Sequence, residues 1–151
     1  MLLPTGNNIK IYAYCIMPDH YHLLLSSKSR AHVSQYINNV ENSFTRYLNV
    51  KSNRKGPLWQ SPYRHSLITD TRVFLHVSRY IHLNPTTSYL TERPDEWRFS
   101  SYSDLISDPT YLRSMPQYAM RTTTAYKNFV ESNIDHQREL RKIKKALLDQ
   151  E

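Results

Sequence analysis

The sequence predicts an α+β fold in which an antiparallel sheet packs with helices. Two observations support this class. Residues 12–25 have the composition of two strands joined by a tight turn, and later segments space their apolar side chains as an amphipathic helix does. A chain of 151 residues is expected to form a single domain around one core. Within residues 1–151, we expect 107–151 to be a helical extension at the C-terminal end.

The two predicted strands lie on either side of Pro18-Asp19, a pair typical of tight turns. Successive side chains of a strand point to opposite faces of the sheet, so His20 and His22 are expected to share one face. Two imidazoles held in this way can bind one divalent cation. A bare pair of histidines is nevertheless more often an ordinary part of a half-buried sheet, and both interpretations remain open at this point.

Two amphipathic helices follow the predicted strands. Residues 31–48 place apolar side chains at i, i+3, i+4 and i+7, which predicts a helix that covers one face of the sheet. The second helix is expected to begin after Asp70, a favourable N-cap, and to end at Asn84, because the residue before Pro85 resists the α conformation. Tyr80 lies one turn before Asn84, so the two share a face. From helical position alone, Tyr80 is more simply a core aromatic.

The remaining segments have weaker patterns. Residues 58–68 are predicted to form a strand that Pro62 interrupts, since proline cannot donate to a β-ladder. A short helix is expected over residues 100–106, and a last helix over 126–148, which ends in a basic run.

A formal net charge of +7 favours a polyanionic partner, nucleic acid above all. The basic loop that carries Lys51, Arg54 and Lys55 precedes Tyr63 and Arg64. Basic side chains beside aromatic ones can contact phosphate and stack on unpaired bases. A solvated loop and a packed tyrosine explain the same residues equally well.

Cysteine and glycine usage excludes several classes of protein. Cys15 is the only cysteine, so a disulfide within the chain is excluded, and a small buried side chain in a reducing cytoplasm is expected. Two glycines are too few for a glycine-rich phosphate loop. The apolar runs are too short to span a bilayer, so no membrane partner is expected.

Four segments together resemble the signature of the IS200/IS605-like Y1 transposases, and most closely their REP-associated tyrosine transposase branch. These enzymes belong to the HUH endonucleases, which are named for a His-hydrophobe-His motif. The order and spacing of the four segments also agree, and the similarity covers roughly residues 11–106. The segments are residues 14–25, 56–64, 79–85 and 97–102.

The resemblance implies a ferredoxin-like antiparallel sheet packed with helices, of the HUH type. It also implies an enzyme that nicks and rejoins single-stranded DNA associated with hairpins. In that family's terms, His20 and His22 bind Mg²⁺ or Mn²⁺ and Asn84 supplies a third ligand. Tyr80 is then the nucleophile, which leaves a 5′-phosphotyrosine and a free 3′-hydroxyl. Such strand transfer conserves bond energy and requires no ATP, in agreement with the missing phosphate loop.

The resemblance also exposes one departure. Only nine residues precede Lys10, where the family usually has a further strand and helix, so we expect the chain to lack these elements. The place of the missing strand is then filled by residues 1–9, by a partner chain or by nothing. An open sheet edge invites pairing with another copy, so we expect self-association, as in a homodimer, or poor solubility. The short N-terminus favours an alternative function, a non-catalytic remnant that only binds hairpin DNA, whereas the presence of every candidate active-site residue favours the enzyme. Either protein is expected in the bacterial cytoplasm, associated with the nucleoid.

Overall fold

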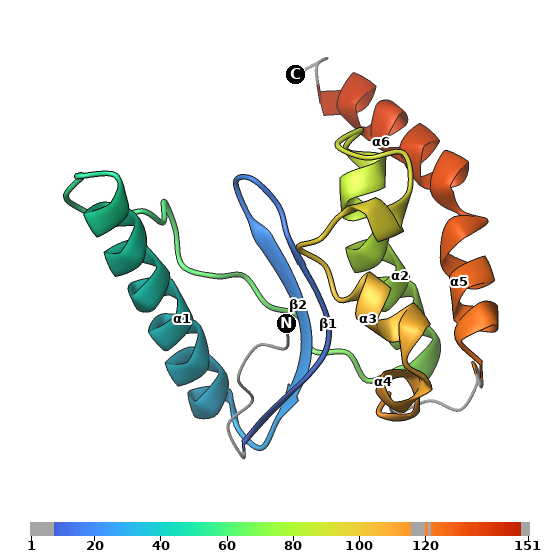
Figure 1. The fold of residues 1–151 in the computed structure, drawn as a ribbon, viewed down its shortest axis with the longest axis horizontal. Coiled ribbons are helices and arrows are strands. Elements are labelled where there is room, and N and C mark those ends of the chain that lie inside the picture. The colour runs from blue at the N-terminus through green and yellow to red at the C-terminus, as the bar shows by residue number, and fades with distance from the viewer. Residues whose placement is uncertain (1–7, 116–119, 121, 149–151) are drawn as a thin grey trace. The chain divides into compact units, whose positions relative to one another are not determined.

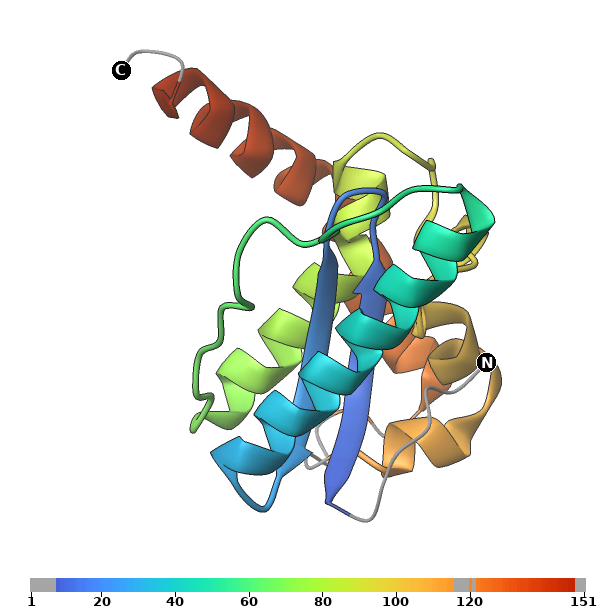
Figure 2. The same ribbon diagram turned by 90° about the vertical axis from the view of Figure 1, so that its left-hand side faces the viewer.

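The computed structural model describes residues 8–115, 120 and 122–148, so the predicted lead-in at residues 1–9 lies mostly outside the described part. A two-stranded antiparallel sheet packs against helices, which confirms the predicted α+β class (Figures 1 and 2). No helix of the described residues is long and apolar enough to cross a membrane. The elements, in chain order, are β1 (Ile9–Ile16), β2 (Tyr21–Ser27), α1 (Arg30–Lys51), α2 (Thr71–Thr87), the 3₁₀ helix η1 (Pro94–Glu96), α3 (Tyr102–Ser107), α4 (Pro109–Arg113), α5 (Thr123–Glu131) and α6 (Ile134–Leu148).

The chain forms two compact units. The larger contains Ile11–Leu25 and the chain from Ile68 onward, and the smaller contains Ser26–Leu67. In the larger unit, Ala13 and Cys15 of β1 are fully buried in a core shared with side chains from α2, α3 and α5. The prediction that Cys15 is a small buried side chain is therefore confirmed.

A segment far along the chain pairs with the edge of β1. The Ile16 N–H donates to the Phe99 carbonyl at 2.9 Å, and the Ser101 N–H donates to the Tyr14 carbonyl at 3.1 Å. Between them, Cys15 and Ser100 form an antiparallel bridge. The pairing segment, residues 99–101, is too short to produce a detectable alternation of apolar and polar side chains. Periodicity therefore did not predict this pairing.

Helix α2 begins as predicted but does not end where expected. The Asp70 carboxylate accepts hydrogen bonds from the N–H groups of Arg72 and Val73, which confirms the N-cap. The helix continues through Pro85 to Thr87, so the predicted end at Asn84 was wrong. Proline removes its own N–H from the helix and disturbs the turn before it, but it leaves its carbonyl as an acceptor. The Leu90 N–H uses the Pro85 carbonyl, at 3.0 Å, to close the last turn.

The strand predicted over residues 58–68 is absent, because this segment forms no β-ladder. Side chains attach this segment to α1 within the smaller unit. Trp59 Nε1 donates to the Glu41 carbonyl at 3.3 Å, and the hydroxyls of Tyr63 and Ser34 are 2.8 Å apart. Pro62 lacks a donor for a ladder, so these side-chain contacts take the place of strand pairing.

The single helix predicted over residues 126–148 is two helices, α5 and α6, separated at Ser132 and Asn133. The Asn133 side chain donates to the Phe129 carbonyl at 3.2 Å. Asparagine competes in this way with backbone N–H groups for helix carbonyls, which explains why the helix stops here.

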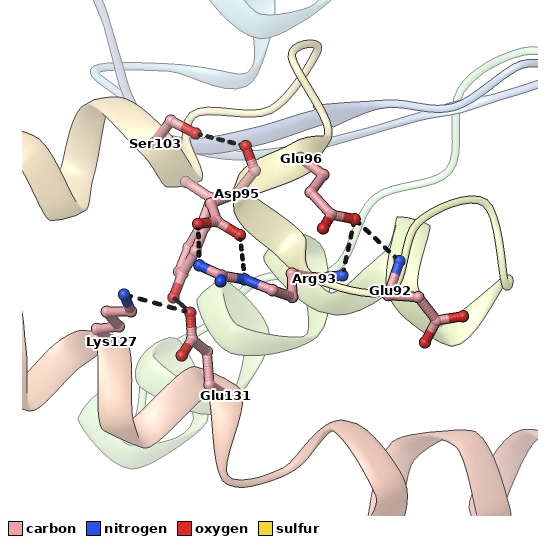
Figure 3. Close-up of polar contacts among 8 residues, drawn as sticks. Glu92, Arg93, Asp95, Glu96, Ser103, Lys127 and Glu131 are labelled. Carbon is pink, nitrogen blue, oxygen red and sulfur yellow. Dashed lines mark hydrogen bonds and ion pairs between the residues drawn. The ribbon is translucent and has the colours of Figure 1, made fainter.

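Short-range polar contacts shape the connection between α2 and α3 and the adjacent face of α5 (Figure 3). Arg93 pairs with Asp95 across η1, and Ser103 of α3 donates to the Asp95 carbonyl at 3.3 Å. On α5, Lys127 lies 4.0 Å from Glu131, one turn later. These contacts order a segment that has no regular period of its own.

Candidate functional site

Three of the predicted site residues lie together in the larger unit. The ring centroids of His20 and His22 are 4.9 Å apart, as expected for neighbours on one face of a strand. The Tyr80 ring, from α2, packs edge-on against His22 with its centroid 5.5 Å away. Residues separated by almost sixty positions are thus brought into one cluster.

His20 is oriented by the residue before it. Its Nδ1 lies 2.6 Å from a carboxylate oxygen of Asp19. The hydrogen bond from His20 is the main cause that lowers the pKa of Asp19, and the charges of His20 and, more weakly, of Arg141 on α6 lower it further. When Nδ1–H donates to a carboxylate, the neutral ring presents Nε2 as its lone-pair nitrogen, an arrangement common around metal-binding histidines.

His22 has an unsatisfied nitrogen. Its Nε2 is buried and has no hydrogen-bond partner among the described residues. Burial, followed by the charge of His20, lowers the pKa of His22, so the ring stays neutral at neutral pH. A buried polar atom without a partner is costly, and a bound cation or ligand oxygen is one way to satisfy it. The two imidazoles therefore fit a divalent ion by their donor chemistry.

Tyr80 and Asn84 differ in exposure and in their contacts with His20 and His22. Tyr80 is 46% exposed, although its ring contacts His22. Asn84 is buried, and its amide nitrogen donates to the Tyr80 carbonyl at 3.3 Å. Within the described residues, no hydrogen bond or ring contact joins Asn84 to either histidine.

No group of three His, Cys, Asp or Glu side chains that could hold a metal occurs in the part of the chain that the structure describes. An ion bound by His20 and His22 would therefore need further oxygen ligands, such as the Asn84 amide, water or substrate phosphate. Phosphate and water are common Mg²⁺ ligands, whereas imidazole alone is not selective for Mg²⁺.

The residues predicted to bind DNA all lie in the smaller unit, and three of them have hydrogen-bond partners within the protein. Arg54 donates to the Pro57 carbonyl at 3.1 Å, and the Tyr63 hydroxyl contacts Ser34. Lys55 and Arg64 are exposed. Lys51 is exposed too, and its Nζ donates to the Tyr47 hydroxyl at 3.1 Å.

Sequence reasoning also missed Arg141, which acts electrostatically on Asp19 beside the histidines. It belongs to the basic run near the C-terminal end, and charge alone gave no reason to place that run near residues 19–22. His82, two residues after Tyr80, was missed as well, although it is fully buried.

Comparison with known proteins gives two matches. The family model described as "Transposase IS200 like" matches residues 3–84, a range that includes His20, His22, Tyr80 and Asn84. A Haemophilus influenzae protein, whose name as a REP-associated tyrosine transposase is itself provisional, is 29% identical over 100 residues. That alignment covers 60% of this chain and 57% of the relative, so the chain spans little more than half of the relative's length. No solved structure matches.

Proposed function

Since the chain belongs to the IS200-like transposase family, whose model matches more than half of its residues, we propose that it nicks and rejoins single-stranded DNA through a covalent link to Tyr80. The observation that carries this proposal is the packing of an exposed tyrosine against His22, which in turn lies beside His20. A nucleophile, a neutral imidazole with an unsatisfied nitrogen and a second, carboxylate-oriented imidazole are the parts that metal-assisted phosphoryl transfer requires.

His20 and His22 would hold the divalent ion, proposed to be Mg²⁺ or Mn²⁺, with Asn84 as the proposed third ligand. When bound, the ion supplies Lewis-acid polarisation of the scissile phosphate. Asp19 orients His20 for this role through the bond at Nδ1. The neutral His22 keeps a nitrogen lone pair in a buried position, away from competing protons.

Tyr80 performs the covalent step. Its hydroxyl oxygen attacks phosphorus, a new O–P bond forms, and the bond from phosphorus to the 3′ oxygen of the upstream nucleotide breaks. The proton lost by the tyrosine is balanced by the proton gained by that 3′ oxygen. The products are a 5′-phosphotyrosine and a free 3′-hydroxyl, and attack by a 3′-hydroxyl on the adduct rejoins the strand. Each step exchanges one phosphodiester for another, so no nucleotide triphosphate is consumed.

The proposed substrate is single-stranded DNA that flanks a hairpin, and such a protein would associate with the nucleoid. The word transposase in the name of the Haemophilus influenzae relative favours DNA as the partner. Self-association is also part of the proposal. This part rests on the general tendency of a sheet edge to pair with the same edge of another copy.

A doubly labelled oligonucleotide tests the reaction. Hairpins with randomised single-stranded flanks, labelled differently at each end, would be incubated with Mg²⁺, Mn²⁺, Zn²⁺ or a chelator. We expect a denaturing gel to show the downstream fragment attached to protein and the upstream fragment released, and only when a divalent ion is present.

Variants assign the roles in this assay. His22→Ala should abolish metal-dependent nicking with hairpin affinity retained, whereas His65→Ala, which alters an exposed histidine outside the cluster, should leave nicking unchanged. Hairpin binding without an adduct in any metal would instead establish the non-catalytic alternative, and nicking by His22→Ala would remove its metal role.

A further inference from the structure

Two of the motifs that resemble the family signature contain polar residues that the proposed reaction does not use. His82 lies in the segment of Tyr80, and Ser101 lies in the segment that pairs with β1. His82 is 0% exposed, and Ser101 is also buried. The His82 Nε2 is 2.9 Å from the Ser101 hydroxyl oxygen, so the two motifs meet through a buried hydrogen bond.

The other side of the imidazole contacts α5. His82 Nδ1 lies 2.8 Å from the hydroxyl oxygen of Tyr126, a residue that is also 0% exposed. The Tyr126 hydroxyl donates to the Ser78 hydroxyl oxygen at 3.0 Å, and Ser78 donates to the Leu75 carbonyl at 2.9 Å. His82 is therefore bonded on both ring nitrogens.

The donors and acceptors assign one direction to this network. Tyr126 gives its proton to Ser78, so it must accept the N–H of His82 Nδ1. The neutral ring then accepts at Nε2, and the Ser101 hydroxyl donates to it at 2.9 Å, a shorter contact than its alternative acceptor, the Tyr14 carbonyl at 3.3 Å. Ser101 in turn accepts the backbone N–H of Tyr14 at 2.9 Å. A continuous set of bonds thus runs from β1, through His82 and Tyr126, to the backbone of α2.

The network lies on the side of α2 opposite Tyr80. Ser78 and His82 are four residues apart and share a face, whereas Tyr80 is two residues from each and points away. Apolar contacts are non-directional and leave a helix some freedom to rotate and slide. Hydrogen bonds are directional, so bonds on both sides of His82 restrict the rotation of α2 against β1. β1 pairs with β2, the strand that carries His22.

We propose that His82 is a positioning residue, which sets the rotation of α2 through Ser101 and Tyr126 and thereby directs Tyr80 toward His22. The predicted effect on the rate of adduct formation rests on the proposed function. The predicted orientation of Tyr80 relative to His22 does not. An error of about 1 Å in the placement of a nucleophile can reduce a rate about 100-fold.

Two matched tyrosine variants separate positioning from general stability. Tyr126→Phe and Tyr102→Phe each remove one phenol hydroxyl from a fully buried ring of the same core. Only Tyr126 bonds to His82, whereas Tyr102 donates to Glu131 at 3.1 Å. At saturating hairpin DNA, we expect Tyr126→Phe to form the adduct roughly 10-fold more slowly, and His82→Leu about 100-fold more slowly. Tyr102→Phe should keep the wild-type rate, and hairpin affinity should stay within about twofold in all three.

His82→Gln should recover part of the rate lost in His82→Leu, because an amide retains a donor and an acceptor. Equal rates in Tyr126→Phe and Tyr102→Phe would overturn the proposal, as would a parallel loss of affinity and rate. The tyrosine pair decides the matter even if His82→Leu does not fold.

A measurement without DNA keeps this test separate from that of the proposed function. In the free protein, nuclear Overhauser effects between the rings of Tyr80 and His22 should be present in the wild type and in Tyr102→Phe, and weakened in Tyr126→Phe. Unchanged effects in Tyr126→Phe would refute the positioning role. An absence of adduct from the wild type, with the expected effects observed, would refute the reaction alone.

Discussion

Two tyrosines in and near the candidate site have different proposed roles because one is exposed and the other is buried. Tyr80 and Tyr126 are both aromatic residues with a phenol, but Tyr80 is 46% exposed and Tyr126 is 0% exposed. Burial raises the pKa of Tyr126, so its hydroxyl stays protonated and acts as a hydrogen-bond donor in the core. A residue that attacks a phosphate must instead reach a bound strand, which among these two only Tyr80 can do.

Replacing Tyr80 by Phe should eliminate the covalent protein–DNA adduct and leave the fold almost unchanged. The ring and its contact with His22 are retained, and a lost exposed hydroxyl costs at most about 1 kcal/mol. Denaturing gels and mapping of the linked peptide would measure the first effect, and thermal denaturation the second. Tyr89→Phe removes a hydroxyl from another exposed tyrosine and serves as the control. An adduct that maps to Tyr89, or that persists in Tyr80→Phe, would refute the assignment.

His82 should make stability depend on pH. Burial lowers its pKa from 6.5 to about 3, so the unfolded chain binds a proton more readily than the folded protein. The free energy of unfolding is therefore highest above pH 6.5. Between pH 6.5 and about 3 it should fall as the pH decreases, with a slope that approaches about 1.4 kcal/mol per pH unit below pH 6.5. Denaturant titrations between pH 6.5 and pH 5 would measure the slope.

The matched variants for this slope are His82→Gln and His65→Gln. The first should reduce the pH dependence to the part that His22 contributes, since burial lowers the pKa of His22 as well. The second removes an exposed histidine and should leave the slope unchanged. Identical slopes in the wild type and His82→Gln would show that protonation of His82 does not oppose folding.

At the scale of elements, α2 is the helix that joins the candidate site to the core. One face carries Ser78 and His82 against β1 and α5, and the opposite side presents Tyr80. Its first turn depends on Asp70, whose carboxylate accepts two backbone N–H groups. The start of α2 therefore depends on a neighbouring residue, Asp70. The rotation of α2 about its axis depends on Ser101 and Tyr126, which are distant in the sequence.

Asp70→Ala should lower the free energy of unfolding by about 1 kcal/mol, because two N–H groups of the first turn lose their acceptor. Asp135→Ala, at an exposed acidic position in the first turn of α6, should change stability by less than about 0.5 kcal/mol. Urea denaturation monitored by circular dichroism would compare the two. Equal effects would mean that general charge, and not capping, explains the loss.

At the scale of the whole molecule, the net charge of +7 should govern DNA affinity. Binding releases counterions from DNA, so affinity should fall as salt increases. Replacing Lys51, Arg54 and Lys55 together by Gln should reduce the slope of log affinity against log salt by about 2, if all three contact single-stranded phosphates. Fluorescence anisotropy with a labelled hairpin oligonucleotide would measure the slope.

A second triple variant, Arg141, Lys142 and Lys144 to Gln, removes the same charge from α6. Because both variants have the same net charge, a difference between their slopes locates the DNA. A reduced slope only in the α6 variant would place the strand along α6, near Asp19, and contradict the prediction for the loop of the smaller unit.

The sequence by itself determined the local features of this protein. The two strands, the start of α2 and the shared face of His20 and His22 depend on alternation, capping and turn residues within a few positions of each other. The four motifs also identified the family before any geometry was known. These features were predictable because the groups involved are neighbours in the chain.

Only the tertiary structure decided which distant groups meet. It paired residues 99–101 with β1, placed Tyr80 against His22, and bonded His82 to Ser101 and Tyr126. In the structure α2 also continues through Pro85 to Thr87, although the residue before a proline usually resists the α conformation. Periodicity indicates that a side chain faces inward, but it does not indicate which residue that side chain contacts. A buried polar group is stable only when a particular donor or acceptor, often far along the chain, lies within hydrogen-bond distance.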